Sequence, residues 1–453
     1  MNGESTAPVG KKLFAGAFLL SLLTKLPFMG GAYGSDYDNS LVAQAARQIA
    51  RDGEYYASRF PGNPLQELTY SLLPNQQPWA FHLLTALLSA AAAGLFGLLA
   101  LQWRAKNPWL LTGAFILLPA FFVNSVTALD YNWSLAFMLA SLYAAHRDRP
   151  YWGGVALGLA TGCRLVSIFI GLPFALLFFV SGAKRPVRGF IFAVLAVLVS
   201  AACFMPAYRA YGMGFFQFYG GTSNIPKLVY RMTAEVWGEL GFLSFIGVAA
   251  VVWKGSRSTR SAGPRDRTIM VYVVSIILNF LIFLRAPFEG EYLLPAATLA
   301  LLLVGRFFSR HQLAIVCAAF ALSLVVGVAK DGSKRGKLVE ELQDRNAAAA
   351  YADHLLKTRA ERPENAVVIA SQYQPLVELR SGAPVASSIE SRGKYPDGYN
   401  GFYRSPNRKT FDEWISAGIP VYAVEGITPG DLELMGYNPA DHGAKLIPKQ
   451  PAR

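Results

Sequence analysis

Long apolar runs recur along this chain from Lys12 to Val328, and each is bounded by charged residues or by proline and glycine. A helix needs an apolar run of such a length to cross the hydrocarbon core of a bilayer. Hydrophobic residues make up 53% of the sequence and charged residues only 16%, which is too apolar for two or three soluble domains. The sequence therefore predicts a polytopic α-helical membrane protein.

Basic residues in the short connectors predict how these runs are oriented. Lys11, Lys12 and the strongly basic connector from Lys254 to Arg267 fit the cytoplasmic side, where connectors carry an excess of positive charge. The chain then crosses the membrane about eleven times, with its N-terminus inside and its C-terminal segment outside. The predicted spans are residues 13–29, 79–103, 109–123, 132–145, two short helices within 151–181, 189–208, 236–253, 268–284, 292–305 and 313–328.

The segment from Tyr151 to Ser181 does not fit an ordinary span, because it is too long for one and too short for two. We predict a hairpin of two short helices whose turn lies near Gly162 and Arg164. Irregular backbone and a cation at this depth are tolerated only inside protein or beside a wet cavity. Arg164 is therefore a candidate functional residue. The alternative is one long tilted helix from which Arg164 reaches the surface.

The formal net charge of +13 does not indicate a nucleic-acid partner, because many of the basic residues lie in connectors between apolar runs. In that position they report membrane orientation. The three cysteines all lie in apolar stretches and indicate neither a disulfide framework nor a metal cluster. We expect a multi-pass protein of the cytoplasmic membrane, surrounded by lipids and without nucleic acid among its partners.

We predict two domains, a transmembrane region at 1–330 and a small extracytoplasmic α/β domain at 331–453. The first outer loop, 30–77, contains two amphipathic stretches, one capped by Asp38 and one after Pro64, which we expect to form helices on the membrane surface. In the C-terminal segment, helical patterns and apolar strand-like runs alternate. The helical patterns cover 337–359 and 409–417, and the strand-like runs cover 366–370 and 420–424.

Acidic residues at the outer mouths of the helices are the candidates for chemistry. Asp36 and Asp38 directly follow the first span, and Asp130 lies in the short connector between spans three and four. A carboxylate in such a place can accept a proton from an acceptor hydroxyl while a lipid-borne donor is presented from the bilayer. Asp38 and Asp130 also have a simpler interpretation as caps of the helices that follow them. Asp36 has no such alternative role.

These features together resemble the GT-C glycosyltransferases, and among them most closely the group of protein O-mannosyltransferases and aminoarabinose transferases. The stretch from Arg59 to Leu65 is similar to the Arg-Phe and Pro-Pro-Leu segment of their first loop, although the lysine usual in that segment is absent. The stretch from Gly153 to Arg164 is similar to their glycine-rich segment before a basic residue. The stretch from Phe288 to Pro295 resembles their Arg-Tyr-Leu-Leu-Pro motif, with Glu291 where arginine is common.

The resemblance implies a polyprenyl-phosphate sugar as donor and direct displacement of the phosphate by a hydroxyl of a glycan, a lipid or a protein. It implies Asp36 as the general base, with Asp130 and Asp38 as further catalytic carboxylates. The leaving phosphate would need positive charge or a divalent cation, Mg²⁺ or Mn²⁺, for which Asp36 and Asp130 are the candidate ligands. The cations that could bind the phosphate, or could instead anchor the chain at lipid headgroups, are Arg59, Arg209, Lys227, Arg231, Arg285 and, deeper in the membrane, Arg164.

Two other classes of function remain open at this point. A transporter for a lipid or small solute would use the predicted hairpin as a broken helix around a midplane site. This would explain Arg164 but not the acids on the outer face. The chain could also be a structural membrane protein without catalytic activity, in which the C-terminal segment carries the function.

Overall fold

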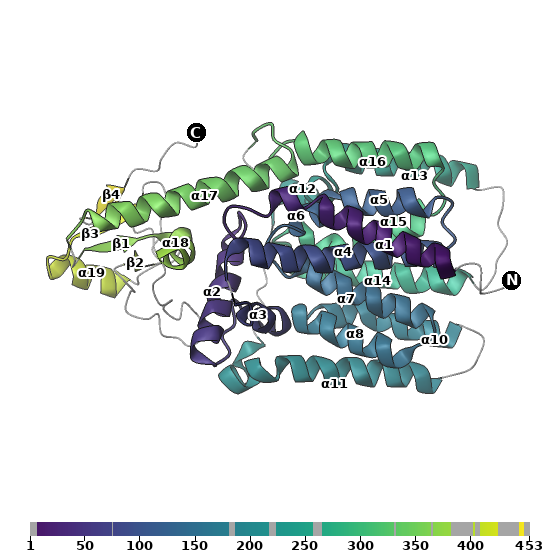
Figure 1. The fold of residues 1–453 in the computed structure, drawn as a ribbon, viewed down its shortest axis with the longest axis horizontal. Helices are drawn as coiled ribbons and strands as arrows, with labels where there is room; N and C mark the ends of the chain where they lie inside the picture. Colours follow the sequence, from purple (N-terminus) through teal and green to yellow (C-terminus); the bar gives the residue numbers. More distant parts are fainter. Residues whose placement is uncertain are drawn as a thin grey trace.

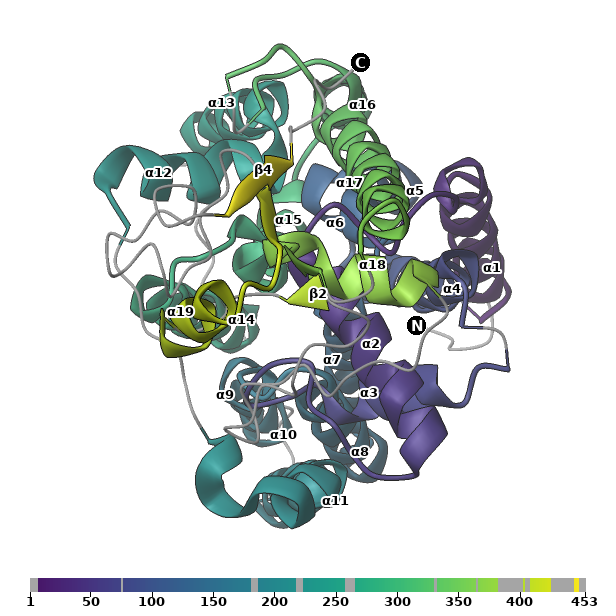
Figure 2. The same cartoon turned by 90° about the vertical axis from the view of Figure 1, so that its left-hand side faces the viewer.

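The computed structural model describes residues 7–74, 76–180, 186–216, 223–256, 265–329, 332–363, 366–381, 402–403, 408–424 and 444–447. Most helices run side by side along one axis, and the C-terminal sheet and its helices lie at one end of this bundle (Figure 1). The same end carries the two helices of the first outer loop, α2 (Tyr37–Asp52) and α3 (Pro64–Ser71) (Figure 2). Helix α17 (Lys337–Ala360), which follows the last helix of the bundle, leads from the bundle to the sheet at this end (Figure 1).

Apolar helices occupy the segments for which the sequence predicts spans. A proline separates two of these helices, α5 and α6. Leu118 precedes Pro119 and therefore takes a non-helical backbone (φ −55°, ψ 119°), which ends α5. The bundle helices are α1 (Ala7–Leu23), α4 (Pro78–Gln102), α5 (Pro108–Leu117), α6 (Pro119–Asn124), α7 (Tyr131–His146), α11 (Pro186–Tyr211), α13 (Glu239–Ser256), α14 (Arg265–Arg285), α15 (Leu294–Gly305) and α16 (Arg310–Val325). Short helical turns join them, namely η1 (Leu26–Phe28), η3 (Gly212–Phe215), α12 (Ile225–Tyr230), η4 (Arg231–Glu235) and η5 (Gly290–Leu293).

Length and hydropathy alone mark three helices of the described chain as able to cross a membrane, at Pro78–Gln102, Pro186–Phe215 and Thr268–Arg285. A fourth is added if the pair Ile225–Glu235 and Glu239–Trp253, bent by 77°, counts as one span. The other apolar helices are shorter than this criterion requires. The count of eleven spans therefore stays a prediction.

The predicted break near Arg164 is confirmed. Helix α8 (Pro150–Cys163) ends at Arg164, which has extended backbone (φ −155°, ψ 107°). Helical structure resumes in α9 (Ser167–Gly171) and continues through η2 (Leu172–Leu176) and α10 (Leu177–Val180). Gly171 lies so close to Leu157 that an added Cβ would come within 2.3 Å of it. The chain thus turns back on α8, and the alternative of one long helix is wrong.

The helix cap at the start of α2 differs from the prediction. The side chain of Asp36, not that of Asp38, caps the helix, and it accepts a hydrogen bond from the Asp38 backbone N–H at 2.8 Å. Asp36 has the extended backbone (φ −76°, ψ 144°) that an N-cap residue requires. The helix therefore begins at Tyr37, earlier than the apolar pattern suggested, and Asp38 lies within its first turn.

The C-terminal segment contains a parallel four-stranded sheet with the strand order β2-β1-β3-β4. Two apolar runs of the sequence, at 366–370 and 420–424, contain the two central strands, whose positions inside a parallel sheet favour continuous apolar residues. The division of the chain into two domains stays a prediction. The elements are β1 (Val367–Ile369), η6 (Ser371–Tyr373), α18 (Gln374–Ser381), β2 (Phe402–Tyr403), α19 (Arg408–Ser416), β3 (Val421–Val424) and β4 (Lys445–Ile447).

A buried polar contact joins the C-terminal segment to the first outer loop. Gln44 of α2 donates to the carboxylate of Glu378 in α18 at 2.6 Å, and Gln374 donates to the same carboxylate. Next to it, Arg47 donates to the backbone oxygen of Leu379 at 2.9 Å. Glu378 is only 2% exposed. Burial raises the pKa of Glu378 to about 7.

We expect burial of Glu378 to cost stability as the pH rises from 4.5 to about 7, because the buried carboxyl group then becomes charged. In that range the folded state binds more protons than the unfolded state, so the free energy of unfolding falls with rising pH, by about 3 kcal/mol in total. Glu378→Gln does not titrate and should remove this dependence. Thermal unfolding at about pH 5 and about pH 8 measures the effect, with Glu361→Gln as the exposed control. An unchanged pH dependence in Glu378→Gln would contradict the prediction.

Candidate active site

Asp130 binds two arginines from distant parts of the chain. Arg164 Nη1 donates to one of its oxygens at 2.7 Å, and Arg59 Nη2 donates to the other at 2.9 Å. Asp130 precedes α7 and is completely buried, and its side chain makes no capping bond. The interpretation of Asp130 as a plain helix cap is therefore wrong. Its carboxylate holds both guanidinium groups at one place.

Aromatic and acidic groups orient the two arginines further. The guanidinium of Arg164 lies 4.2 Å from the ring centroid of Tyr131 and 4.3 Å from that of Tyr292, within the range of a cation–π interaction. Arg59 also donates to the carboxylate of Asp38, at the start of α2. The break after α8 thus supplies one cation, the first outer loop supplies the other, and α7 and η5 supply the rings.

A buried carboxylate fixes the loop that carries Arg59. Glu67 of α3 is completely buried. It accepts hydrogen bonds from the Ser58 backbone at 2.7 Å, from the Ser58 hydroxyl at 2.5 Å and from the Asn63 backbone at 3.2 Å. Tyr55 donates to the same carboxylate. Burial raises the pKa of Glu67, although these hydrogen bonds oppose that effect.

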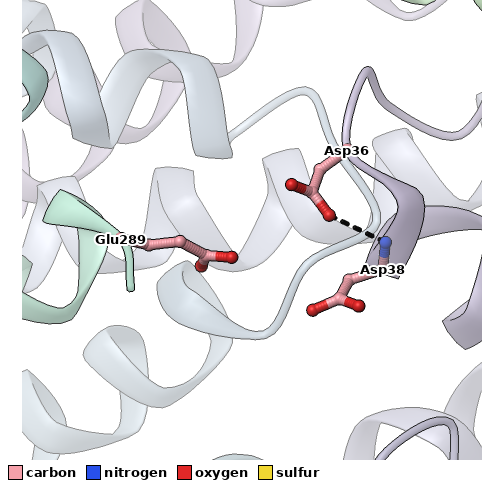
Figure 3. Close-up of side chains that lie close together, drawn as sticks. All are labelled: Asp36, Asp38 and Glu289. Atoms are coloured by element: carbon pink, nitrogen blue, oxygen red, sulfur yellow. Dashed lines mark hydrogen bonds between the residues drawn. The ribbon is translucent and has the colours of Figure 1, made fainter. Parts of the chain in front are cut away.

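Three carboxylates meet beside this arginine pair. Oxygens of Asp36, Asp38 and Glu289 all lie within 4.8 Å of one another. In Figure 3 Glu289 reaches from a separate segment toward the two aspartates at the start of α2. Glu289 also accepts a hydrogen bond from Tyr131. Burial first, and then the negative charge of Asp36, raise the pKa of Glu289.

Two cavities meet at these acids. The larger, of about 460 Å³, is lined by Arg59, Arg164 and both tyrosines, and its wall continues over apolar side chains that include Leu165, Ile170 and Ile282. The smaller, of about 120 Å³, is lined by Asp36 on one side and by acids of α17 on the other. Glu289 and Glu291 line both cavities. The larger cavity can hold an anionic group with an apolar tail, and Asp36 faces the smaller one.

The predicted site residues are distributed unevenly over this arrangement. Arg59 and Arg164 line the larger cavity, and Asp130 lies behind them without lining either cavity in the described chain. Asp130 is linked to the acids at α2 through Arg59, which contacts both Asp130 and Asp38. Arg231 donates to the backbone oxygen of Pro287 and lines neither cavity. The remaining predicted cations, which are exposed and line neither cavity in the part that the structure describes, are Arg209, Lys227 and Arg285.

Sequence reasoning missed the role of Glu289, Tyr292 and Tyr131. The segment from Phe288 to Pro295 stood out by its resemblance to a known motif, but the motif gave no reason to place its first acid beside Asp36. Tyr131 directly follows Asp130 in the sequence. An aromatic residue directly after a candidate acid was the signal that the sequence offered.

No family model and no curated protein matches the chain. Among solved structures, ArnT from Cupriavidus metallidurans bound to undecaprenyl phosphate is 14% identical, with a TM-score of 0.50 over 100% of this chain and 87% of that one. The apo state of the same protein aligns with 15% identity and a TM-score of 0.49 over 98% and 89%. The chain thus shares the fold of ArnT.

Proposed function

We propose that this chain transfers a sugar from a polyprenyl-phosphate donor to an acceptor hydroxyl, with inversion, on the extracytoplasmic face of the cytoplasmic membrane. The observation that carries the proposal is the pair of arginines held together by Asp130 at the wall of a cavity of about 460 Å³. Guanidinium groups bind phosphate through several parallel N–H donors. The apolar part of the same wall suits a polyprenyl chain. The solved structure of ArnT with undecaprenyl phosphate supports this choice of donor.

The positions of the acids and the arginines support the following reaction. Asp36 takes the proton of the acceptor hydroxyl, and the acceptor oxygen forms a bond to the anomeric carbon of the sugar. The bond between that carbon and the phosphate oxygen breaks, and the polyprenyl phosphate leaves with the electron pair. Arg59 and Arg164 stabilise the negative charge of the leaving group, because both line the cavity in which it would lie.

A divalent cation, Mg²⁺ or Mn²⁺, fits three of these carboxylates. From the sequence, Asp36 and Asp130 were the candidate ligands of this cation. In the structure, however, both oxygens of Asp130 contact arginines. We propose Asp36, Asp38 and Glu289 instead, because their oxygens lie within 4.8 Å of one another and such hard cations prefer carboxylate ligands. The cation would supply positive charge that offsets the repulsion among the three carboxylates.

The proposal is tested with lipid-linked sugars from cells that lack the protein. We expect one polyprenyl-phosphate sugar to accumulate there and the purified protein to consume it, releasing polyprenyl phosphate. Arg164→Met should weaken binding of undecaprenyl phosphate by about 10-fold to 100-fold, the value of lost charge-assisted hydrogen bonds. Arg209→Met removes the same charge from an exposed position and is the matched control.

Three results would contradict the proposal. The first is equal weakening of undecaprenyl phosphate binding by Arg164→Met and by the control. The second is consumption of no lipid-linked sugar by the wild-type protein. The third is movement of the lipid-linked sugar across the membrane without cleavage, which would favour the transporter.

A further inference from the structure

Helix α17 of the C-terminal segment inserts a buried arginine between the two connectors that carry the catalytic acids. Arg345 is completely buried. Its Nη1 donates to the backbone oxygens of Phe28 at 3.2 Å and Gly30 at 3.1 Å, in the connector that leads to Asp36. The same nitrogen lies 3.2 Å from the backbone oxygen of Val126, in the connector that leads to Asp130. One side chain therefore contacts both connectors.

Glu341, one helical turn before Arg345, contacts the residue next to the proposed base. Its carboxylate accepts a hydrogen bond from the Ser35 backbone N–H at 2.9 Å and another from the Ser35 hydroxyl. Glu341 also lies 3.6 Å from the Nε of Arg345. Because Ser35 directly precedes Asp36, the helix fixes the backbone at the point from which the Asp36 side chain projects.

The two connectors also bind each other, so that a shift in one reaches the other. The Ala128 N–H contacts the backbone oxygen of Tyr33 at 3.0 Å and the side-chain oxygen of Asn39 at 2.9 Å. Gly31 has a positive φ of 90°, and a Cβ there would come within 3.0 Å of the Asn346 side chain. The connector can therefore approach α17 this closely only with glycine at that position.

We propose that α17 completes the active site and that Glu341 and Arg345 are positioning residues for Asp36. This inference rests on the proposed function of Asp36. In Figure 1, α17 continues from the bundle toward the sheet, so a single helix joins the C-terminal segment to the catalytic connectors. The C-terminal segment is accordingly part of the catalytic apparatus, although it supplies none of the proposed catalytic groups.

Loss of these contacts should lower turnover without weakening donor binding, because neither Arg59 nor Arg164 has a hydrogen bond or ion pair to α17 among the described contacts. We expect Arg345→Met to lower kcat by about 100-fold, the effect of a displacement of about 1 Å at a reacting group. Arg345→Lys keeps the charge and part of the hydrogen bonding and should restore part of the activity. Glu341→Gln keeps one acceptor for Ser35 and should lower kcat by about 10-fold.

The matched control is Asp353→Asn on the same helix. It removes an exposed ion pair with Arg380, 2.5 Å long, and touches neither connector. We expect kcat within about 2-fold of the wild-type value, since exposed ion pairs contribute little. Binding of undecaprenyl phosphate should be unchanged in all four variants. A fall in donor binding and in folded protein, with unchanged turnover per folded molecule, would show a merely structural role and overturn the inference.

Hydrogen exchange separates a failure of this inference from a failure of the proposed function. Amides of residues 28–36 should exchange faster in Arg345→Met and Glu341→Gln than in the wild type, while amides of residues 55–63 around Arg59 should not change. This measurement does not need transferase activity. Unchanged exchange at 28–36 would overturn the inference whether or not the wild-type protein transfers sugar. Inactivity of the wild type with the expected exchange pattern would overturn only the proposed function.

Discussion

Asp36→Asn is expected to lower the rate of sugar transfer by about 10²-fold to 10⁴-fold, the contribution of a general base. The fold should survive, because Asn caps helices as well as Asp and can accept the same hydrogen bond from the Asp38 N–H. The unfolding temperature and the affinity for undecaprenyl phosphate should therefore stay near the wild-type values. Turnover at saturating donor, measured on purified protein, checks this expectation.

The control for Asp36→Asn lies at the other end of the same helix. Asp52→Asn neutralises a carboxylate of α2 that pairs with Arg51 on the surface, and it should leave turnover unchanged. Full activity of Asp36→Asn would remove Asp36 as the base. Loss of activity in both variants would indicate that α2 responds to charge in general.

Asp130→Asn is expected to lower kcat/KM by about 10²-fold or more. The affected step is binding of the donor, not proton transfer from the acceptor. The amide has one oxygen where the carboxylate has two, so it cannot hold both Arg59 and Arg164. Removing one partner of a buried ion pair also costs about 3–5 kcal/mol of stability. We therefore expect weaker binding of undecaprenyl phosphate together with a lower unfolding temperature.

Measured donor affinity distinguishes the role of Asp130 from that of Asp36. Binding of undecaprenyl phosphate should fall in Asp130→Asn and remain in Asp36→Asn. Asp148→Asn is the control, since Asp148 pairs with Arg188 in an exposed ion pair. Normal donor affinity in a folded Asp130→Asn protein would rule out the arginine pair as the phosphate site.

The sequence marked Asp36 and Asp130 as candidates because they lie in connectors at the outer ends of the first and third spans, and Arg164 because a charge within an apolar segment is rare and costly. It also predicted the helix break at Arg164, since the apolar run there fits no ordinary span. It did not separate Arg59 from Arg209 or Arg285. Charge and predicted sidedness are the same for all of these, and only packing shows that Arg59 is half-buried against an acid while Arg209 and Arg285 are exposed.

No local sequence pattern predicted which distant segments of the chain meet at the site. Glu289 meets Asp36 across more than 250 residues of chain. Arg345 lies in a helix whose alternating charges are typical of a solvated surface, yet it is completely buried. The pattern correctly predicted that α17 is a helix. It gave no indication that the helix packs on the connectors of the first and third spans.

Arg164 stands at the tip of a helical hairpin, while Asp36 caps a helix of the first outer loop. The proposed phosphate-binding cation of the hairpin and the proposed base thus come from different parts of the chain, and Asp130 and Arg59 link them. Inserting a full helical turn in both arms of the hairpin would move the Arg164 guanidinium by about 5.4 Å along the bundle and away from Asp130. Evolution or design would therefore have to shift the hairpin and the connector of Asp130 together to move the site of the lipid carrier.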